Sequence, residues 1–160
     1  MLETEKSQEL YHAAVALLAR REYSKGELEE RLLKKTDAYH EVEAVVERLS
    51  EQGLQSDERF CESFVRYRIE QGKGPLKIRQ DLKFKKISEE LISLHLDIAR
   101  ELWFERAVSV LLRKFPALPQ ESGQLEAKEK AKCLRFLLSR GFSSDIAYDA
   151  LNKVFMSSQA

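Results

Sequence analysis

The sequence predicts an all-α protein made of three tandem repeats of a three-helix unit. Of its 160 residues, 34% are charged and 43% hydrophobic, while Gly occurs only 6 times and Pro 3 times. Chains rich in charged helix formers and poor in helix breakers are mostly helical. Apolar residues recur at the spacing of a buried helix face through most segments, and no segment alternates convincingly like a strand. Together these observations exclude collagen-like, disordered and all-β classes.

Three apolar stripes with helical spacing occur before residue 55. Their residues are, in chain order, Leu10, Ala14, Leu17 and Leu18, then Leu28 and Leu32, then Val42, Val45, Val46 and Leu49. Ser24 and Glu27 form an S-x-x-E capping box at the start of the second helix, in which the serine oxygen accepts from a backbone N–H and the glutamate can bond back. Gly53 follows the third stripe and suits the left-handed residue just past a helix end.

The middle of the chain predicts three more helices. Ser56 and Asp57 begin the first, which stops near Gly72. Pro75 fits the first turn of the second helix, where its missing N–H is tolerated, and Ser88 caps the third. The aliphatic residues that the second and third helices carry are Leu76, Ile78, Leu82, Leu91 and Ile92. The aromatic residues Phe60, Phe64, Tyr67 and Phe84 have helical spacing, and we expect them in the core rather than on a base-stacking platform.

The last third of the chain again predicts three helices. The first starts near Arg100 and ends before Phe115. The segment from Pro116 to Gln124 is the one most clearly predicted to be a loop. The next helix is closed by Gly141, and the last begins at residues 143–145. Their apolar residues are Phe104, Ala107, Val108, Leu111 and Leu112, then Ala127, Ala131, Leu134 and Leu138, then Ile146, Ala147, Ala150, Leu151 and Val154.

Weak internal sequence similarity divides these helices into repeats. Residues 21–24 and 140–143 each end a leucine-rich helix and begin a capped one. Gly74, Ile78 and Leu82 match Ser24, Leu28 and Leu32 at a constant offset of 50. We therefore predict three repeats at residues 1–55, 56–98 and 99–160. Stacking of such units predicts an elongated, curved body.

The residues offer no catalytic constellation, metal site or cofactor site. His12, His40 and His95 are scattered, and no Ser or Cys motif accompanies them. Cys61 and Cys133 lack the spacing of metal ligands and are expected to be buried free thiols. No run of about 18 apolar residues occurs, and the N-terminus does not resemble a secretory signal. These features predict a cytoplasmic protein that is not an enzyme and has no membrane span. We also expect a monomer.

Positive and negative charges are equal in number over the whole chain, but they are unevenly distributed among its segments. The 27 Lys and Arg residues equal the 27 Asp and Glu residues. Residues 1–56 contain 8 basic and 12 acidic residues, residues 57–86 contain 9 and 5, and residues 87–160 contain 10 of each. The middle segment is therefore the basic part of the chain.

A basic stripe in this middle segment is the candidate binding surface. If Pro75 opens a helix, Arg79, Lys83 and Lys86 lie at i, i+4 and i+7 on one face. Lys73, Lys77 and Lys85 add to the same charge. Such a stripe attracts phosphate backbones or an acidic protein groove, and a solvated helix face without a partner is the alternative.

Three motifs occur in order along the chain. They are residues 18–24 with Glu27, Leu28 and Leu32; residues 53–54 and 56–60 with Phe64, Arg68, Gly72, 74–76, 78–80 and Leu82; and residues 128–132 with 135–137 and 140–143. Together they resemble the RecX family of bacterial regulators. Where the chain departs from the family pattern, Cys61 replaces a small residue, Lys73 an aromatic residue and Lys86 a glycine, and Thr36 and Asp37 lack the usual turn glycine. The resemblance spans nearly the whole chain.

The resemblance implies three three-helix repeats and a non-enzymatic regulator of the RecA recombinase. Such proteins bind the RecA filament on single-stranded DNA and inhibit its extension, ATPase, strand exchange and coprotease activities. This would place the chain in DNA repair and control of the SOS response. Arg59 and Arg68 match family positions and join the six cations above as candidate partner-binding residues, or else are structural ion-pair partners.

Two other function classes remain open at this point. One is a helical module that binds DNA directly through the basic stripe, although the acidic first repeat would oppose it. The other is a helical scaffold for an unrelated protein.

Overall fold

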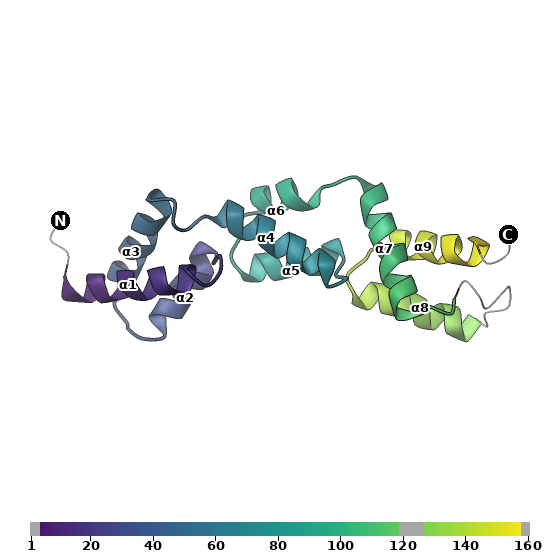
Figure 1. The fold of residues 1–160 in the computed structure, drawn as a ribbon, viewed down its shortest axis with the longest axis horizontal. Helices are drawn as coiled ribbons and strands as arrows, with labels where there is room; N and C mark the ends of the chain where they lie inside the picture. Colours follow the sequence, from purple (N-terminus) through teal and green to yellow (C-terminus); the bar gives the residue numbers. More distant parts are fainter. Residues whose placement is uncertain (1–3, 119–126, 158–160) are drawn as a thin grey trace. The chain divides into compact units, whose positions relative to one another are not determined.

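The computed structural model describes residues 4–118 and 127–157, and every regular element in those residues is an α-helix (Figure 1). The helices are α1 Glu5–Leu18, α2 Lys25–Leu33, α3 Tyr39–Glu51, α4 Asp57–Glu70, α5 Pro75–Phe84, α6 Glu89–Leu96, α7 Arg100–Lys114, α8 Ala127–Ser139 and α9 Ser144–Ser157. This order confirms the all-α prediction. Of the predicted loop, Pro116–Leu118 forms a turn, and residues 119–124 lie outside the described residues.

The chain divides into two compact units. Unit 1 comprises Met1–Phe64 and Leu82–His95, and unit 2 comprises Val65–Asp81 and Leu96–Ala160. The division therefore falls within α4, α5 and α6, so each of these helices has residues in both units. The repeat boundaries expected at residues 55 and 98, and the elongated, curved shape, stay predictions.

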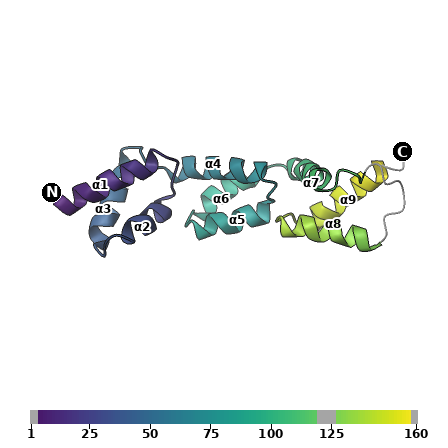
Figure 2. The ribbon, with the colours of Figure 1, turned by 60° about the horizontal axis from the view of Figure 1, so that its bottom comes forward.

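Unit 1 has its core among α1, α2 and α3, which all pack against one another (Figure 2). The buried residues of this core are Leu10, Ala14, Tyr23, Leu28, Leu32, Val42, Val45, Val46 and Leu49. All but Tyr23 belong to the three stripes expected from the sequence. Leu17 and Leu18 pack on the edge of this core and are only partly buried.

The predicted capping box starts α2 but only half of it has the expected geometry. The Ser24 hydroxyl oxygen accepts from the Glu27 N–H at 3.0 Å and donates to the Lys85 carbonyl at 2.8 Å. The Glu27 carboxylate accepts from Arg21 at 3.0 Å and from Lys85 at 2.7 Å. The capping pair therefore also ties the start of α2 to the turn that follows α5.

Unit 2 has its core among α7, α8 and α9, which also pack pairwise. Its buried apolar residues from α7 onward are Trp103, Ala107, Leu111, Leu118, Cys133, Leu137, Phe142, Ile146, Ala147, Ala150, Leu151 and Val154. Trp103, rather than the neighbouring Phe104, is the deeply buried aromatic residue of α7, and its indole Nε1 donates to the Leu96 carbonyl at 3.2 Å.

The two cysteines are buried free thiols, as predicted. Cys61 lies in α4, and desolvation together with the nearby Asp57 carboxylate raises the pKa of its thiol to about 11. A thiol that stays protonated in this way is a poor nucleophile and a poor metal ligand.

The prediction that the middle aromatic residues are core residues is wrong for two of them. Phe60 is buried, but Tyr67 is 59% exposed and Phe84 is 82% exposed. Phe84 lies two residues after the buried Leu82, so a helix turns it by about 200° to the opposite face. In α4 the core position is occupied by Val65 instead of Tyr67.

In the residues that the structure describes, no helix is long and apolar enough to cross a membrane.

Candidate functional site

The predicted basic stripe does not form as one helical face. Helix α5 ends at Phe84, and Lys86 has φ +64°, a left-handed conformation outside the helix. The Ile87 N–H then donates back to the Leu82 carbonyl at 3.1 Å, as in a helix-terminating motif. Arg79 belongs to unit 2, whereas Lys83 and Lys86 belong to unit 1. The expected alignment is wrong because the helix stops before its last member.

The candidate cations of unit 1 each have an acidic partner within that unit. The pairs are Arg59–Glu22 at 3.0 Å, Lys83–Glu89 at 2.9 Å, Lys85–Glu27 at 2.7 Å and Lys86–Glu30 at 3.2 Å. Arg59 also donates to the Gly53 carbonyl at 2.8 Å. These cations hold local structure together, and their charge is largely balanced within the chain.

The candidate cations of unit 2 differ in their ion pairs. Arg79 pairs with Asp97 at 3.2 Å. Arg68 and Lys77 share one carboxylate, that of Asp81, at 3.7 and 3.2 Å. The half-buried Lys73 has no ion-pair partner among the described residues.

A further cation, Arg140, joins this group from the end of α8. The N–H of Gly74 donates to the Arg140 carbonyl at 2.7 Å, and the N–H of Leu76 donates to the Gly141 carbonyl at 2.9 Å. These bonds hold the turn between α4 and α5 against the turn between α8 and α9. Lys73 and Arg140 therefore lie side by side although they are far apart in the sequence. We call Arg68, Lys73, Lys77 and Arg140 the four-cation cluster.

Two glycines allow this close approach of the backbones. A Cβ atom on Gly74 would lie 2.5 Å from the Gly141 carbonyl carbon, and one on Gly141 would lie 2.4 Å from the Lys77 Cβ. Gly141 also has φ +99°, which side chains disfavour. The cluster geometry thus depends on glycine at both positions.

Lys73 is surrounded by like charges. Partial burial, and after it repulsion from Arg140, Arg68 and Lys77, lowers the pKa of the Lys73 ammonium. Asp81 is the one nearby carboxylate that acts in the other direction. An external anion placed beside Lys73 would relieve this repulsion.

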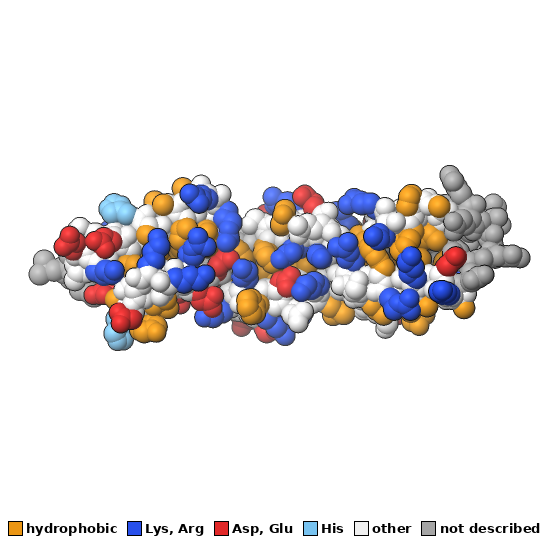
Figure 3. Space-filling model, turned by 90° about the horizontal axis from the view of Figure 1, so that it is seen from below, with side chains coloured by type: hydrophobic (Ala, Val, Ile, Leu, Met, Phe, Trp, Pro, Cys, Tyr) orange, Lys and Arg blue, Asp and Glu red, His pale blue; other side chains and the backbone are white. Residues whose placement is uncertain are grey.

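A row of residues along α8 continues the positive charge. Lys128, Lys132, Phe136 and Arg140 follow at intervals of four residues, and so lie on one face of the helix. From Ala127 to Arg140 there are five basic residues and one acidic residue. We call Lys128, Lys132, Phe136 and Arg140 the α8 row. Figure 3 shows Lys and Arg side chains over this part of unit 2, and others over unit 1.

Aromatic rings lie among the cations at this end of unit 2. The Arg140 guanidinium is 5.1 Å from the centroid of the half-buried Phe136 ring, and the Lys114 Nζ is 5.9 Å from it. Phe115 packs edge-on against Phe136 and has the Lys132 Nζ 5.9 Å from its own centroid. Cation–π contacts of this kind stabilise the positions of long side chains by a modest free energy.

The charge summed over residues 87–160 hides this surface, because basic and acidic residues cancel there. The charge summed over α8 alone reveals it. The bond between Gly74 and Arg140 joins segments far apart in the sequence and has no local signal.

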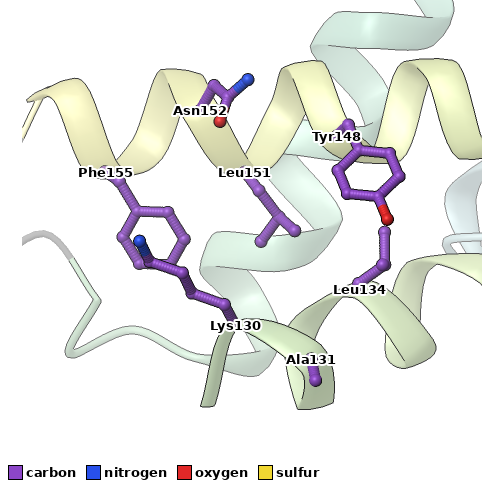
Figure 4. Close-up of a pocket in the computed structure, with 7 residues that line it drawn as sticks. All are labelled: Lys130, Ala131, Leu134, Tyr148, Leu151, Asn152 and Phe155. Carbon is purple, nitrogen blue, oxygen red and sulfur yellow. The ribbon is translucent and has the colours of Figure 1, made fainter. Parts of the chain in front are cut away.

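A shallow apolar pocket of about 390 Å³ lies between α8 and α9 (Figure 4). It is lined by Lys130, Ala131, Leu134, Tyr148, Leu151, Asn152 and Phe155. The Lys130 Nζ lies 5.2 Å from the Phe155 ring, and no acid–base pair faces the pocket. Among the residues described, no group of three His, Cys, Asp or Glu side chains could hold a metal ion.

Three family models match the chain in order. They describe the first three-helix domain of RecX at residues 11–49, the second at residues 56–96 and the third at residues 98–151. The tandem three-helix architecture is thereby confirmed.

Proteins named regulatory protein RecX are similar over most of the chain. The one from Actinobacillus pleuropneumoniae serotype 5b (strain L20) is 40% identical over 129 residues, which are 81% of this chain and 82% of the relative. The one from Legionella pneumophila (strain Corby) is 39% identical over 145 residues, which are 91% of each chain.

Two solved structures have the same fold. A crystal structure of regulatory protein RecX has a TM-score of 0.77 at 26% identity, over 93% of this chain and 72% of the other. The crystal structure of RecX from Lactobacillus salivarius has a TM-score of 0.78 at 22% identity, over 95% and 98% of the two chains.

Proposed function

The chain belongs to the RecX family of regulatory proteins, and from this premise we propose that it is a non-enzymatic regulator of the RecA filament on single-stranded DNA. In this proposal it binds the filament and inhibits its extension, ATPase, strand exchange and coprotease activities. It would act as a monomer in the cytoplasm, in DNA repair and SOS control.

The observation that carries the proposal, beyond family membership, is the four-cation cluster. A nucleoprotein filament presents phosphates and acidic side chains, and a surface with unbalanced cations is suited to both. The chain as a whole has no net charge, so nonspecific attraction to polyanions is weak and binding must come from a local surface.

Filament binding should depend on many weak contacts. Exposed ion pairs each contribute about 0–1 kcal/mol, so no single pair is decisive. Contacts to neighbouring RecA protomers would reinforce each other through effective concentration. The association should therefore weaken as salt screens the charges.

Cosedimentation tests the binding itself. We expect the chain to pellet with RecA filaments assembled on single-stranded DNA with a nonhydrolysable ATP analogue, and to release as salt rises. RecA without DNA, under the same conditions, is the control for filament dependence. A chain that stays in the supernatant even at low salt would contradict the proposal.

A further inference from the structure

We propose that the four-cation cluster and the α8 row bind the phosphodiester backbone of the single-stranded DNA inside the filament. This inference rests on the proposed function and names the component of the filament that the surface contacts. It assigns the contact to unit 2 alone, with Arg140, Lys128 and Lys132 added to Arg68, Lys73 and Lys77.

Two cations of the cluster have surplus positive charge. Lys73 and Arg140 lie at the junction of the two turns without an ion-pair partner among the described residues. Lys73 is partly buried, so it contributes its positive charge at a reduced pKa. An anion bound here would satisfy charges that the fold leaves uncompensated.

The cations of α8 lie along one face of the helix. Members of the α8 row are one helical turn apart, about 6 Å, and the row from Lys128 to Arg140 extends for about 18 Å. Lys128 and Lys132 are exposed, and neither has an ion-pair partner in the part of the chain that the structure describes. Three cations along one helix face, at residues 128, 132 and 140, suit a linear polymer that has one negative charge per unit.

Aromatic rings hold part of the row in position. The guanidinium of Arg140 is kept over Phe136, and Lys132 is kept near Phe115, so these side chains lose less freedom on binding. Guanidinium groups can bond phosphate oxygens through two N–H groups at once. Half-buried rings that support cations are consistent with contacts to the backbone rather than with base stacking.

The contrast with unit 1 shows why the surface is confined to unit 2. There, Lys83, Lys85 and Lys86 all have acidic partners within the chain. Binding phosphate with those lysines would require breaking existing pairs. The predicted stripe is therefore a poorer phosphate site than the cluster that replaces it.

The test is direct binding to a fluorescent oligothymidylate without RecA, followed by anisotropy over a salt series. We expect the full chain to bind at low salt and the double substitution Lys73→Gln with Arg140→Gln to weaken binding about tenfold. Each phosphate contact on a single strand contributes about 0.7 to the slope of log affinity against log salt, so losing two lowers the slope by about 1.4.

A matched control separates local charge from net charge. Lys34 and Lys35 are exposed in unit 1, just after α2, and replacing both with glutamine removes the same charge. We expect this control to bind the oligonucleotide as the unchanged chain does. Circular dichroism and the thermal midpoint of both variants verify that they are folded.

The outcomes separate the inference from the proposed function. If the unchanged chain does not bind the oligonucleotide, or the cluster variant binds with the same affinity and slope, the inference is wrong. Filament cosedimentation that persists in that case would leave the proposed function standing, with a protein surface as the contact. DNA binding without any filament binding would instead overturn the proposed function.

Discussion

Replacing Gly141 with alanine is expected to lower the free energy of unfolding by about 2–5 kcal/mol. Gly141 has φ +99°, and its new Cβ would lie 2.4 Å from the Lys77 Cβ and 2.7 Å from the Lys77 backbone nitrogen. The clash involves backbone that is itself bonded across the two turns, so it cannot be relieved by rotating a side chain. Urea unfolding followed by far-UV circular dichroism measures the loss.

Gly53→Ala is the matched control for this substitution. Gly53 also has a positive φ, +75°, but nothing lies within 4 Å of the position of its Cβ. The control therefore reports only the backbone cost of a left-handed alanine, about 1–2 kcal/mol. Equal losses for the two variants would show that the turns at Gly74 and Gly141 are not in the close contact described.

The second large effect concerns regulation. We expect Lys73→Gln with Arg140→Gln to raise the concentration that half-inhibits the RecA filament about tenfold at low salt. The physical reason is the loss of two cations that have no acidic partner among the described residues, at the point where the two turns meet. Inhibition of RecA strand exchange measures the effect.

The comparison variant for this prediction is Lys83→Gln with Lys86→Gln. It removes the same charge from residues that pair with Glu89 and Glu30. We expect this variant to inhibit RecA nearly as well as the unchanged chain. A larger loss for this variant than for the cluster variant would return the binding surface to the stripe expected from the sequence.

Much of the fold could be predicted because local chemistry determines where its helices begin and end. Ser24 caps α2, and Gly53, Gly72 and Gly141 have the positive φ that helix ends favour. The apolar spacing identified the core of α1–α3 almost residue by residue. These features act within a few residues, so a single sequence contains them.

Side-chain exposure was harder to predict, since one residue turns a helix face by about 100°. The sequence predicts Phe84 in the core with Leu82, but Phe84 is exposed on the opposite face of α5. Trp103 is buried in place of the half-buried Phe104 for the same reason.

The candidate site was predicted only in part. Lys73, Lys77 and Arg68 were among the expected cations, but so were four that the fold pairs with glutamates of unit 1. Which cation has a partner depends on contacts between distant segments, such as Lys85 with Glu27. The same holds for Arg140, which reaches Lys73 only because Gly74 and Gly141 bring two turns together.

The central claim is that this RecX-family chain restrains the RecA filament, and the most direct measurement is the DNA-dependent ATP hydrolysis of RecA. RecA on single-stranded DNA is titrated with the chain from far below one molecule per protomer, at low salt. We expect hydrolysis to fall already at these low ratios, because bridging or blocking contacts act on several protomers at once. Hydrolysis that stays unchanged even at an excess of the chain would contradict the claim.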